Sequence, residues 1–464
     1  MVNYDVCVVG GGPAGSTIAK KLSDFGYSVI LIEKENTPLP NIGLTLSPGV
    51  KHWLKLLDIE ESVENAGFDK AEVSWLCWES EQVQVKNNQV PGYHVNRTIL
   101  NTILLNNAAL AGAKILRPCT LCDIKQDSEG TWNILLKHDG APLRIYSQFL
   151  VEATGRKAVL KGSRQSYLPA TTSVYAFWKE TPLKKNISFI EAGDNHFYWG
   201  ANMPTCGYMI CIFSDPMEIR KYQSPKAFYL DKIQYSSLLP YIIEKNANIV
   251  DQVSVCTATA FYDKEPISAN YIKIGDAAFS LDPLSSQGVQ KAMKTGFQGA
   301  IVINTLLKKK QNGHMAIDYY KSMIKREIKR NTNWTQQLYN DQNRYRGGEF
   351  WQLRKNPLIE NYEKEQENKI AIQPNDILII NPDARIVDVP ILGEYLIEHQ
   401  PGITFNDNEE PFVFLQSVPI VPLIRNICNN TLSESLHIIH LSFPKSKPLD
   451  VIQWLIFNKI ICIQ

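Results

Sequence analysis

Three glycines and one carboxylate near the start of the chain have the spacing of a site for a phosphorylated ligand. Gly10, Gly12 and Gly15 follow an apolar run, and Glu33 ends a second one. In such a pattern the first glycine permits a tight turn, the second leaves bare backbone for a pyrophosphate, and the third lets a helix pack close to the strand. A carboxylate placed like Glu33 can accept hydrogen bonds from both hydroxyls of a ribose. The pattern predicts a dinucleotide site.

The elements around these residues support that prediction. Residues 4–9 favour a buried strand, residues 16–23 have helical spacing, and residues 27–32 favour a second strand. Pro13 and Ala14 then lie in the turn, where the amides at the start of the helix would face the phosphates. We also place Lys34 in this site. An accidental glycine turn is the alternative, but a strand, a turn, a helix and a second strand are all present.

A second set of small and polar residues follows a buried strand at 271–274. Gly275 and Asp276 end that strand, and a helix is predicted to open near Gly288 and to run to about Leu307. Its N-terminus would meet the same ligand. We expect Ser285, Ser286 and Gln287 to lie against that ligand, with helix capping as the equal alternative, because serine is a favoured capping residue. Earlier in the chain, Arg97 precedes a predicted helix at 98–111, and Thr154-Gly155-Arg156 forms another small-residue turn.

Composition limits the class of protein. The chain has 464 residues, 44% hydrophobic and 20% charged, which is enough for two or three structural units. The formal net charge of +1 gives no whole-molecule attraction to nucleic acid or to an anionic membrane. No run reaches the ~20 apolar residues of a membrane span, and the N-terminus lacks a signal-peptide pattern, so we expect a cytoplasmic location. Nine scattered cysteines indicate reduced thiols rather than a metal site.

The remaining segments differ in character. Alternating, aromatic-rich stretches between 173 and 213 predict an antiparallel sheet that carries the substrate site, followed by a helix at 226–244 and a strand at 253–261. The predicted units are a first domain at 1–170 with an excursion near 65–95, the inserted sheet at 171–262, the rest of the first domain with long helices at 263–345, a linker at 346–375, and a small unit at 376–464. The last unit resembles a winged helix but lacks a basic recognition helix, so no nucleic-acid partner is expected.

Together, the glycine fingerprint with Glu33, the Val95-x-Arg97-x-x-Leu100 helix start, and Gly275-Asp276 followed by Asp282-Pro283 and Gly288-Val289 resemble a known superfamily. This is the glutathione-reductase superfamily, and the resemblance is to those of its FAD-dependent enzymes that have the hydroxybenzoate-hydroxylase-like fold. The resemblance implies an α/β fold: a Rossmann-like FAD-binding domain, an inserted antiparallel-sheet substrate domain and a small C-terminal α+β unit. It also implies that Asp276 binds the ribityl chain of FAD, that the helix after Pro283 faces the flavin pyrimidine, and that Gly288 and Val289 offer amides to its N1–O2 edge.

Within the superfamily, the chain looks most like flavin-dependent halogenases and the monooxygenases that hydroxylate a tryptophan on a partner polypeptide during quinone-cofactor maturation. Two departures from the halogenase pattern matter. Trp199 matches the first tryptophan of W-x-W-x-I-P, but Ala201 replaces the second; Leu44 replaces the usual glutamate. Lys70 stands where halogenases carry a lysine, with the spacing to Phe68 changed by one. The NADPH-associated Asp-Gly motif of classical aromatic hydroxylases is also missing, which implies a separate flavin reductase.

The leading hypothesis is therefore an FAD-dependent monooxygenase, in which reduced flavin captures O2 as a C4a-hydroperoxide and an aromatic substrate is hydroxylated. The alternatives are a halogenase, a reductase or dehydrogenase, and a non-catalytic flavin-binding scaffold, because a fold alone does not determine function. The substrate would be a small aromatic molecule, a peptide or a carrier-bound group. We expect the sheet that carries Trp178, Phe197, Tyr198 and Trp199 to wall its pocket. Only the aromatics on the flavin side can serve, and plain core packing is the alternative. Lys70 is the candidate catalytic lysine of the halogenase alternative, and we expect it to be dispensable.

Overall fold

A computed structural model describes residues 2–36, 45–160, 162–179, 186–203, 206–244, 247–250, 252–355, 372–405, 410–444 and 446–464. The loop around Ile42–Leu44, on which part of the halogenase comparison depends, lies outside these residues. The chain divides into two compact units, residues 1–360 and 361–464. Within the described ranges, no helix combines the length and the apolar character that crossing a bilayer requires.

The first unit is built on a seven-stranded sheet in the order β6-β2-β1-β9-β8-β7, with β17 also pairing with β9. The strands β2, β1, β9, β6 and β17 pair in parallel, and β9, β8 and β7 form an antiparallel meander. Their bounds are β1 (Val2–Val9), β2 (Val29–Ile32), β6 (Lys114–Leu116), β7 (Cys119–Gln126), β8 (Trp132–His138), β9 (Ala141–Glu152) and β17 (Tyr271–Lys273). Because parallel strands are covered on both faces, β2 consists only of buried apolar residues.

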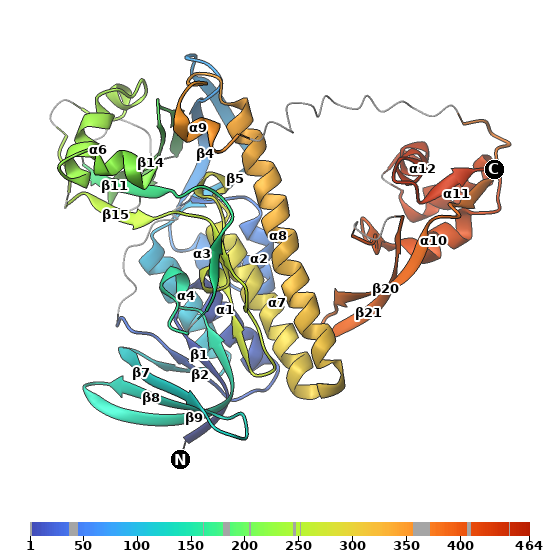
Figure 1. The fold of residues 1–464 in the computed structure, drawn as a ribbon, viewed down its shortest axis with the longest axis horizontal. Coiled ribbons are helices and arrows are strands. Elements are labelled where there is room, and N and C mark those ends of the chain that lie inside the picture. The colour runs from blue at the N-terminus through green and yellow to red at the C-terminus, as the bar shows by residue number, and fades with distance from the viewer. Residues whose placement is uncertain are drawn as a thin grey trace. The chain divides into compact units, whose positions relative to one another are not determined.

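Helices cover this sheet and lie close to the predicted cofactor turns (Figure 1). The main ones are α1 (Pro13–Asp24), α4 (Arg97–Leu110), α7 (Gly288–Lys308) and α8 (Gly313–Asp341). A Cβ on Gly296 would lie 2.6 Å from the carbonyl oxygen of Ala14, so a glycine is needed where α7 crosses α1. The helices predicted at 98–111 and after Gly288 are confirmed as α4 and α7. Short helices α2 (Val50–Leu56) and α3 (Glu60–Glu64) lie between β3 and β4 in the chain.

The second sheet has eight strands in the order β15-β11-β14-β13-β12-β4-β5-β3. All its neighbours pair antiparallel except β12 and β4, which are parallel. This sheet is the predicted inserted sheet, with β3 to β5 added from the earlier part of the chain. The bounds are β3 (Thr45–Leu46), β4 (Asp69–Cys77), β5 (Gln84–His94), β11 (Thr172–Trp178), β12 (Ile187–Ala192), β13 (His196–Met203), β14 (Gly207–Ser214) and β15 (Ser254–Thr257).

Three predicted elements differ in extent. The helix predicted at 226–244 is α6 (Pro225–Ile233), after α5 (Pro216–Arg220). It ends because the hydroxyl of Ser236 accepts the backbone N–H groups of Leu238 and Leu239, which starts a separate turn. The strand predicted at 253–261 is divided between β15 and β16 (Phe261–Asp263), which pairs with β10 (Arg164–Ser166) and β18 (Phe279–Ser280). The predicted linker began too early, because Phe350 and Trp351 of α9 (Glu349–Gln352) are buried among the aromatic residues of the second sheet.

The second unit is α+β, as predicted. It has the two-stranded pairs β19 with β24, β20 with β21, and β22 with β23, and three helices packed around one apolar core. Its elements are β19 (Leu378–Ile380), β20 (Arg385–Leu392), β21 (Ile397–Thr404), β22 (Phe414–Leu415), β23 (Val418–Pro419), α10 (Ile420–Ile427), α11 (Leu432–Ser442), α12 (Pro448–Phe457) and β24 (Ile461–Ile463). Thr431 and Glu434 form a capping box at the start of α11.

Candidate functional site

The glycines of the first turn have different structural roles. Gly10 has a φ of +108°, and a Cβ there would lie 2.5 Å from the carbonyl oxygen of Ala153. A Cβ on Gly15 would lie 1.9 Å from the carbonyl oxygen of Gly10. A Cβ on Gly12 would meet nothing within 4 Å. The fold therefore requires the first and third glycines, whereas the second leaves space over the N-terminus of α1, as a bound pyrophosphate needs.

Residues at the two ends of this turn are placed as the fingerprint requires. Pro13 is the first residue of α1, and Ala14 is buried behind the turn. Glu33 follows β2, and its Oε2 accepts the backbone N–H of Gly11 at 2.5 Å. Lys34 points differently: its ammonium lies 3.8 Å from Glu35, and its side chain is 69% exposed. The role of Lys34 in cofactor binding stays a prediction.

The structure brings three separate predicted turns together. Gly10 lies against Ala153 at the end of β9, and a Cβ on Gly275 would lie 2.9 Å from the Cβ of Ala14. The residues of the glycine fingerprint, the Thr154-Gly155 turn and Gly275-Asp276 thus share the carboxyl-end edge of the parallel strands. This edge is where open α/β sheets bind ligands.

Three cations surround the carboxylate of Asp276. Lys291 Nζ lies 2.5 Å from its Oδ1, and Arg156 Nε lies 3.4 Å from its Oδ2. Burial would raise the pKa of Asp276, but the positive charges of Lys291, Arg156 and Arg97 hold it below its usual value. Burial lowers the pKa of Arg97 to about 10, opposed by Asp276. The four formal charges sum to +2, which suits a cofactor that carries a negatively charged diphosphate.

Sequence reasoning did not identify Lys291 as part of this site. Its side chain is only 3% exposed, and its ammonium also donates to the carbonyl oxygen of Phe279. A signal was available, because Lys291 precedes Thr295 and Gln298 at helical spacing, and that side of α7 is buried. A lysine on the buried face of a helix needs a partner. The partner is Asp276, 15 residues earlier in the chain.

The loop that leads into α7, residues 281–287, is stabilised by hydrogen bonds within itself and with α8. The Asp282 carboxylate accepts the N–H of Leu284 and the hydroxyl of Tyr339, and burial raises its pKa. Ser285 donates to the carbonyl oxygen of Asp282 at 2.7 Å, so its hydroxyl serves the loop itself.

Five further predicted site residues lie in this loop and at the start of α7. Pro283 begins its 3-10 turn, and Ser286 is exposed with a φ of +49°. Gln287 stands before Gly288 at the start of α7 and makes no side-chain capping bond there. Val289 is buried against α2 and α4. Their contacts with flavin remain predictions.

The four aromatic residues expected on the second sheet lie on its two different faces. Phe197 and Trp199 pack on the face that also contacts Leu284 of the loop before α7. Trp178 and Tyr198 lie on the opposite face, where Trp178 donates to the hydroxyl of Tyr229 of α6. Of the four expected aromatic residues, Phe197 and Trp199 therefore lie on the loop side, because successive side chains of a strand point to opposite faces. On the loop side, Tyr175, Phe177 and Trp199 are only half-buried.

Of the residues that bear on halogenation, Trp199 and Ala201 lie on this face, whereas Lys70 is not part of its cluster. Lys70 lies in β4 and is exposed, while its neighbour Asp69 accepts a hydrogen bond from Asn202 of β13 at 3.1 Å. Ala201 is fully buried in the aromatic cluster of the loop-side face. Among the residues that the structure describes, no group of histidine, cysteine, aspartate and glutamate side chains has the arrangement of a metal site.

The buried imidazole of His94, three residues before Arg97, gives the protein a testable dependence of stability on pH. It is fully buried, its Nδ1 lies 2.9 Å from the hydroxyl of Thr45, and burial lowers its pKa to about 4. In the unfolded chain the His94 imidazole takes up a proton near pH 6.5, whereas in the folded protein it does so only near pH 4. Acid therefore favours unfolding between pH 6.5 and 4. At pH 5 this single group should cost on the order of 2 kcal/mol. We expect His94→Asn to lose less stability than the parent protein between pH 7 and pH 5.

The measurement for His94 is urea unfolding at each pH. Asparagine can keep the bond to Thr45 without the titration. The same replacement at exposed His314, at the start of α8, is the control and should leave the acid dependence unchanged. An unchanged dependence in His94→Asn would show that His94 is not held neutral. Burial also lowers the pKa of His196, to about 3, so part of the dependence should remain.

Comparisons with known proteins agree with this geometry. The profile of the family described as "FAD binding domain" matches residues 3–335. A tryptophan 2-halogenase of Chondromyces crocatus is 26% identical over 334 residues, which cover 68% of this chain and 64% of the halogenase. The match thus spans slightly less than two thirds of that relative. The putative FAD-dependent oxidoreductase LodB of Marinomonas mediterranea is 23% identical over 365 residues, covering 73% of this chain and 96% of LodB.

Two solved structures share the fold over nearly the whole chain. The flavin-dependent halogenase CmlS has a TM-score of 0.82 at 15% identity and covers 100% of this chain and 96% of its own. The peptidyl tryptophan dihydroxylase QhpG has a TM-score of 0.74 at 20% identity and covers 99% of each chain. At such identities the likeness shows the fold alone. By the family match over residues 3–335, together with the converging glycine turns, the chain belongs to the FAD-binding-domain family and is an FAD-dependent enzyme.

Proposed function

We propose that this enzyme is a monooxygenase that hydroxylates an aromatic group. The observation that carries the proposal is the half-buried aromatic surface of Tyr175, Phe177 and Trp199 on the sheet face that contacts Leu284. Reduced flavin, when bound, supplies the activation of O2. The protein holds FAD through the glycine turn, Glu33 and Asp276, and the aromatic surface would hold an electron-rich ring and keep water away from it.

Halogenation is the second candidate, and the named relatives keep it open. Homologues include a tryptophan 2-halogenase and a chlorinase whose substrate is pyrrole-2-carbonyl on a peptidyl carrier protein. Against halogenation in this chain stand the exposure of Lys70 and the buried Ala201 at the second tryptophan of the halogenase pattern. A lysine that positions a reactive halogen species must be close to the substrate and partly desolvated. An exposed lysine on an accessible strand does not meet that requirement.

The proposed substrate is attached to a polypeptide or to a carrier protein. QhpG acts on a peptidyl tryptophan, and two of the related halogenases act on carrier-bound pyrroles. A separate reductase would supply reduced flavin, because Thr154-Gly155-Arg156 occupies the position of the NADPH-associated motif. Arg156 there is engaged by the carbonyl oxygen of Thr259 and by Asp276.

Product analysis tests this proposal directly. The enzyme would be given chemically reduced FAD, O2, and bromide or chloride. The substrates would be tryptophan and pyrrole, each free, peptidyl or carrier-bound, and the products would be identified by mass spectrometry. We expect a gain of one or more oxygen atoms, unchanged in amount in Lys70→Ala. The exposed Lys86 of β5 gives a matched control, Lys86→Ala. Halogenated product that disappears in Lys70→Ala but not in Lys86→Ala would establish the halogenase alternative instead.

A further inference from the structure

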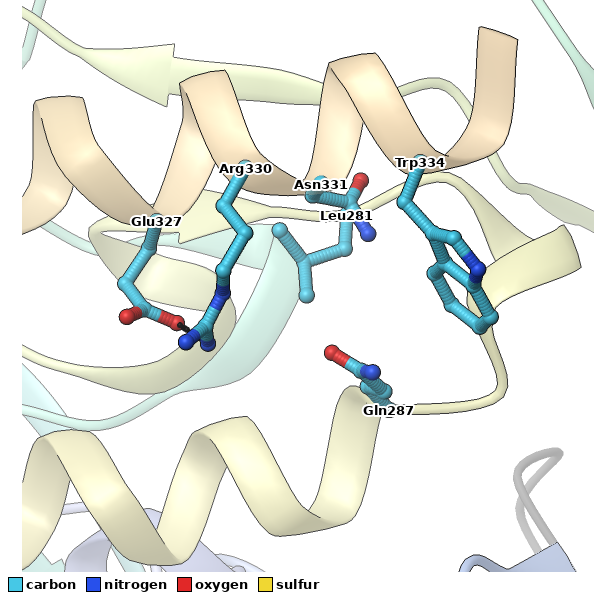
Figure 2. Close-up of a pocket in the computed structure, with 6 residues that line it drawn as sticks. All are labelled: Leu281, Gln287, Glu327, Arg330, Asn331 and Trp334. Carbon is cyan, nitrogen blue, oxygen red and sulfur yellow. Dashed lines mark hydrogen bonds and ion pairs between the residues drawn. The ribbon is translucent and has the colours of Figure 1, made fainter. Parts of the chain in front are cut away.

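A cavity of about 140 Å³ lies on the α8 side of the loop before α7 (Figure 2). It is lined by Leu281, Gln287, Glu327, Arg330, Asn331 and Trp334. Leu281 and Gln287 lie at either end of the loop, and the other four come from α8. An engineered protein cavity of about 150 Å³ takes up one benzene molecule, so this space is the size of a single aromatic ring.

Asn331 gives the cavity an unused hydrogen-bond donor. The residue is 4% exposed, and its Nδ2 has no hydrogen-bond partner among the residues that the structure describes. Its Oδ1 faces the N–H of Asp282 at 3.4 Å, which accounts for the orientation of the amide. Figure 2 shows the amide nitrogen on the side toward Gln287. A buried donor without an acceptor is unfavourable, so an acceptor that reaches this nitrogen from the cavity would bind with a gain.

The charges around the cavity favour an anion. Glu327 is paired twice, with Lys294 at 2.6 Å and with Arg330 at 2.8 Å, so the three groups sum to +1. The bond to Glu327 uses one terminal nitrogen of the Arg330 guanidinium. A carboxylate has two oxygens in one plane and matches the guanidinium fork better than a single-atom acceptor does.

The apolar part of the cavity favours a flat ring. The indole of Trp334 is 41% exposed and stands at one end of the cavity, with Leu281 between it and Arg330 (Figure 2). Aromatic rings pack well against an indole, and the exposed ring edge leaves a way in. The indole and the guanidinium are thus placed to hold the two ends of one small molecule.

We propose that this cavity binds a single-ring aromatic carboxylate, with the ring against Trp334 and the carboxylate on Arg330 and the Asn331 amide. The site is distinct from the aromatic surface of Tyr175, Phe177 and Trp199, which belong to the second sheet. Because Leu281 and Gln287 end the loop that leads into α7, a ligand there contacts the segment predicted to bind flavin. The proposal does not depend on whether the enzyme hydroxylates or halogenates.

The test is a calorimetric titration of the FAD-loaded, full-length protein with benzoate. Benzamide serves as the neutral probe of the same shape. We expect benzoate to bind at least tenfold more tightly than benzamide. Arg330→Gln and Trp334→Leu should each weaken benzoate binding about tenfold, since a hydrogen bond to a charged group and a stacked ring are each lost. Arg326→Gln, one turn earlier on α8 and packed over Tyr319, is the matched control and should bind benzoate like the parent.

Asn331→Leu completes the set, because leucine keeps the branched shape of asparagine without its polar atoms, and benzoate binding should again fall about tenfold. If this buried replacement impairs folding, the two variants at accessible positions decide the question. Benzoate that binds equally to the parent, Arg330→Gln and Trp334→Leu would place it elsewhere and overturn the proposal, as would a complete lack of binding. The FAD content of each variant is measured separately, so failure of this site is distinguished from failure of the cofactor site.

Discussion

The Gly12→Val protein is expected to fold normally and to purify without bound FAD. Gly12 has a φ of −72°, which any residue adopts, and a Cβ there meets nothing within 4 Å. The fold alone therefore does not require glycine at this position. The isopropyl group would occupy the space that the fingerprint reserves for the pyrophosphate. Steric overlap of this kind costs about 1–3 kcal/mol, which is roughly a ten- to hundredfold loss of affinity.

Two measurements check this expectation: FAD fluorescence titration of the apoprotein, and thermal unfolding without FAD. The apoprotein of Gly12→Val should unfold at the same temperature as the parent apoprotein. Gly15→Ala is the matched contrast, because its Cβ would lie 1.9 Å from the carbonyl oxygen of Gly10. That variant should lose stability whether or not FAD is present. A Gly12→Val protein that binds FAD as the parent does would contradict the placement of the cofactor over this turn.

Local patterns predicted the elements that hold the cofactor. The apolar runs of β1 and β2, the glycines between them and Arg97 at the first position of α4 all follow from short-range spacing. Predictions failed where a contact with a distant residue decides the structure. The helix at 226–244 was predicted too long because Ser236, which ends it, bonds to the buried Glu191 of β12 as well as to its own turn. Spacing alone does not reveal that partner.

The candidate site was predicted in outline but not in its charges. Residue types indicated Glu33, Asp276 and the start of α7, since each belongs to a short motif. For the sheet aromatics, the sequence predicted that only those on the flavin side can serve, but residue type does not say which these are; in the structure Tyr198 and Trp199 point to opposite faces of β13. Three cations surround Asp276: Arg156 from the turn after β9, Arg97 from α4 and Lys291 from α7. They are far apart in the sequence, so only the folded chain brings them together.

Loss of Lys291 is expected to have the second large effect. In Lys291→Met the apolar side chain has a similar length, so packing is kept while the charge is removed. Asp276 then loses its 2.5 Å partner and the carbonyl oxygen of Phe279 loses its donor. Breaking a buried ion pair typically costs about 3–5 kcal/mol. Asp276 is one-third exposed and keeps Arg156 at 3.4 Å, so we expect roughly 2 kcal/mol here.

The double variant Asp276→Asn/Lys291→Met separates stability from cofactor binding. Replacing both partners removes the uncompensated carboxylate, so urea unfolding of the apoprotein should show that part of the stability lost in Lys291→Met returns. FAD affinity should not return, because the carboxylate predicted to bind the ribityl chain is then absent as well. Lys291→Arg, which keeps the charge, should retain more FAD than Lys291→Met. If Lys291→Met instead matches the parent in both stability and FAD affinity, the pair with Asp276 contributes to neither, and the positive charge around this carboxylate comes effectively from Arg97 and Arg156.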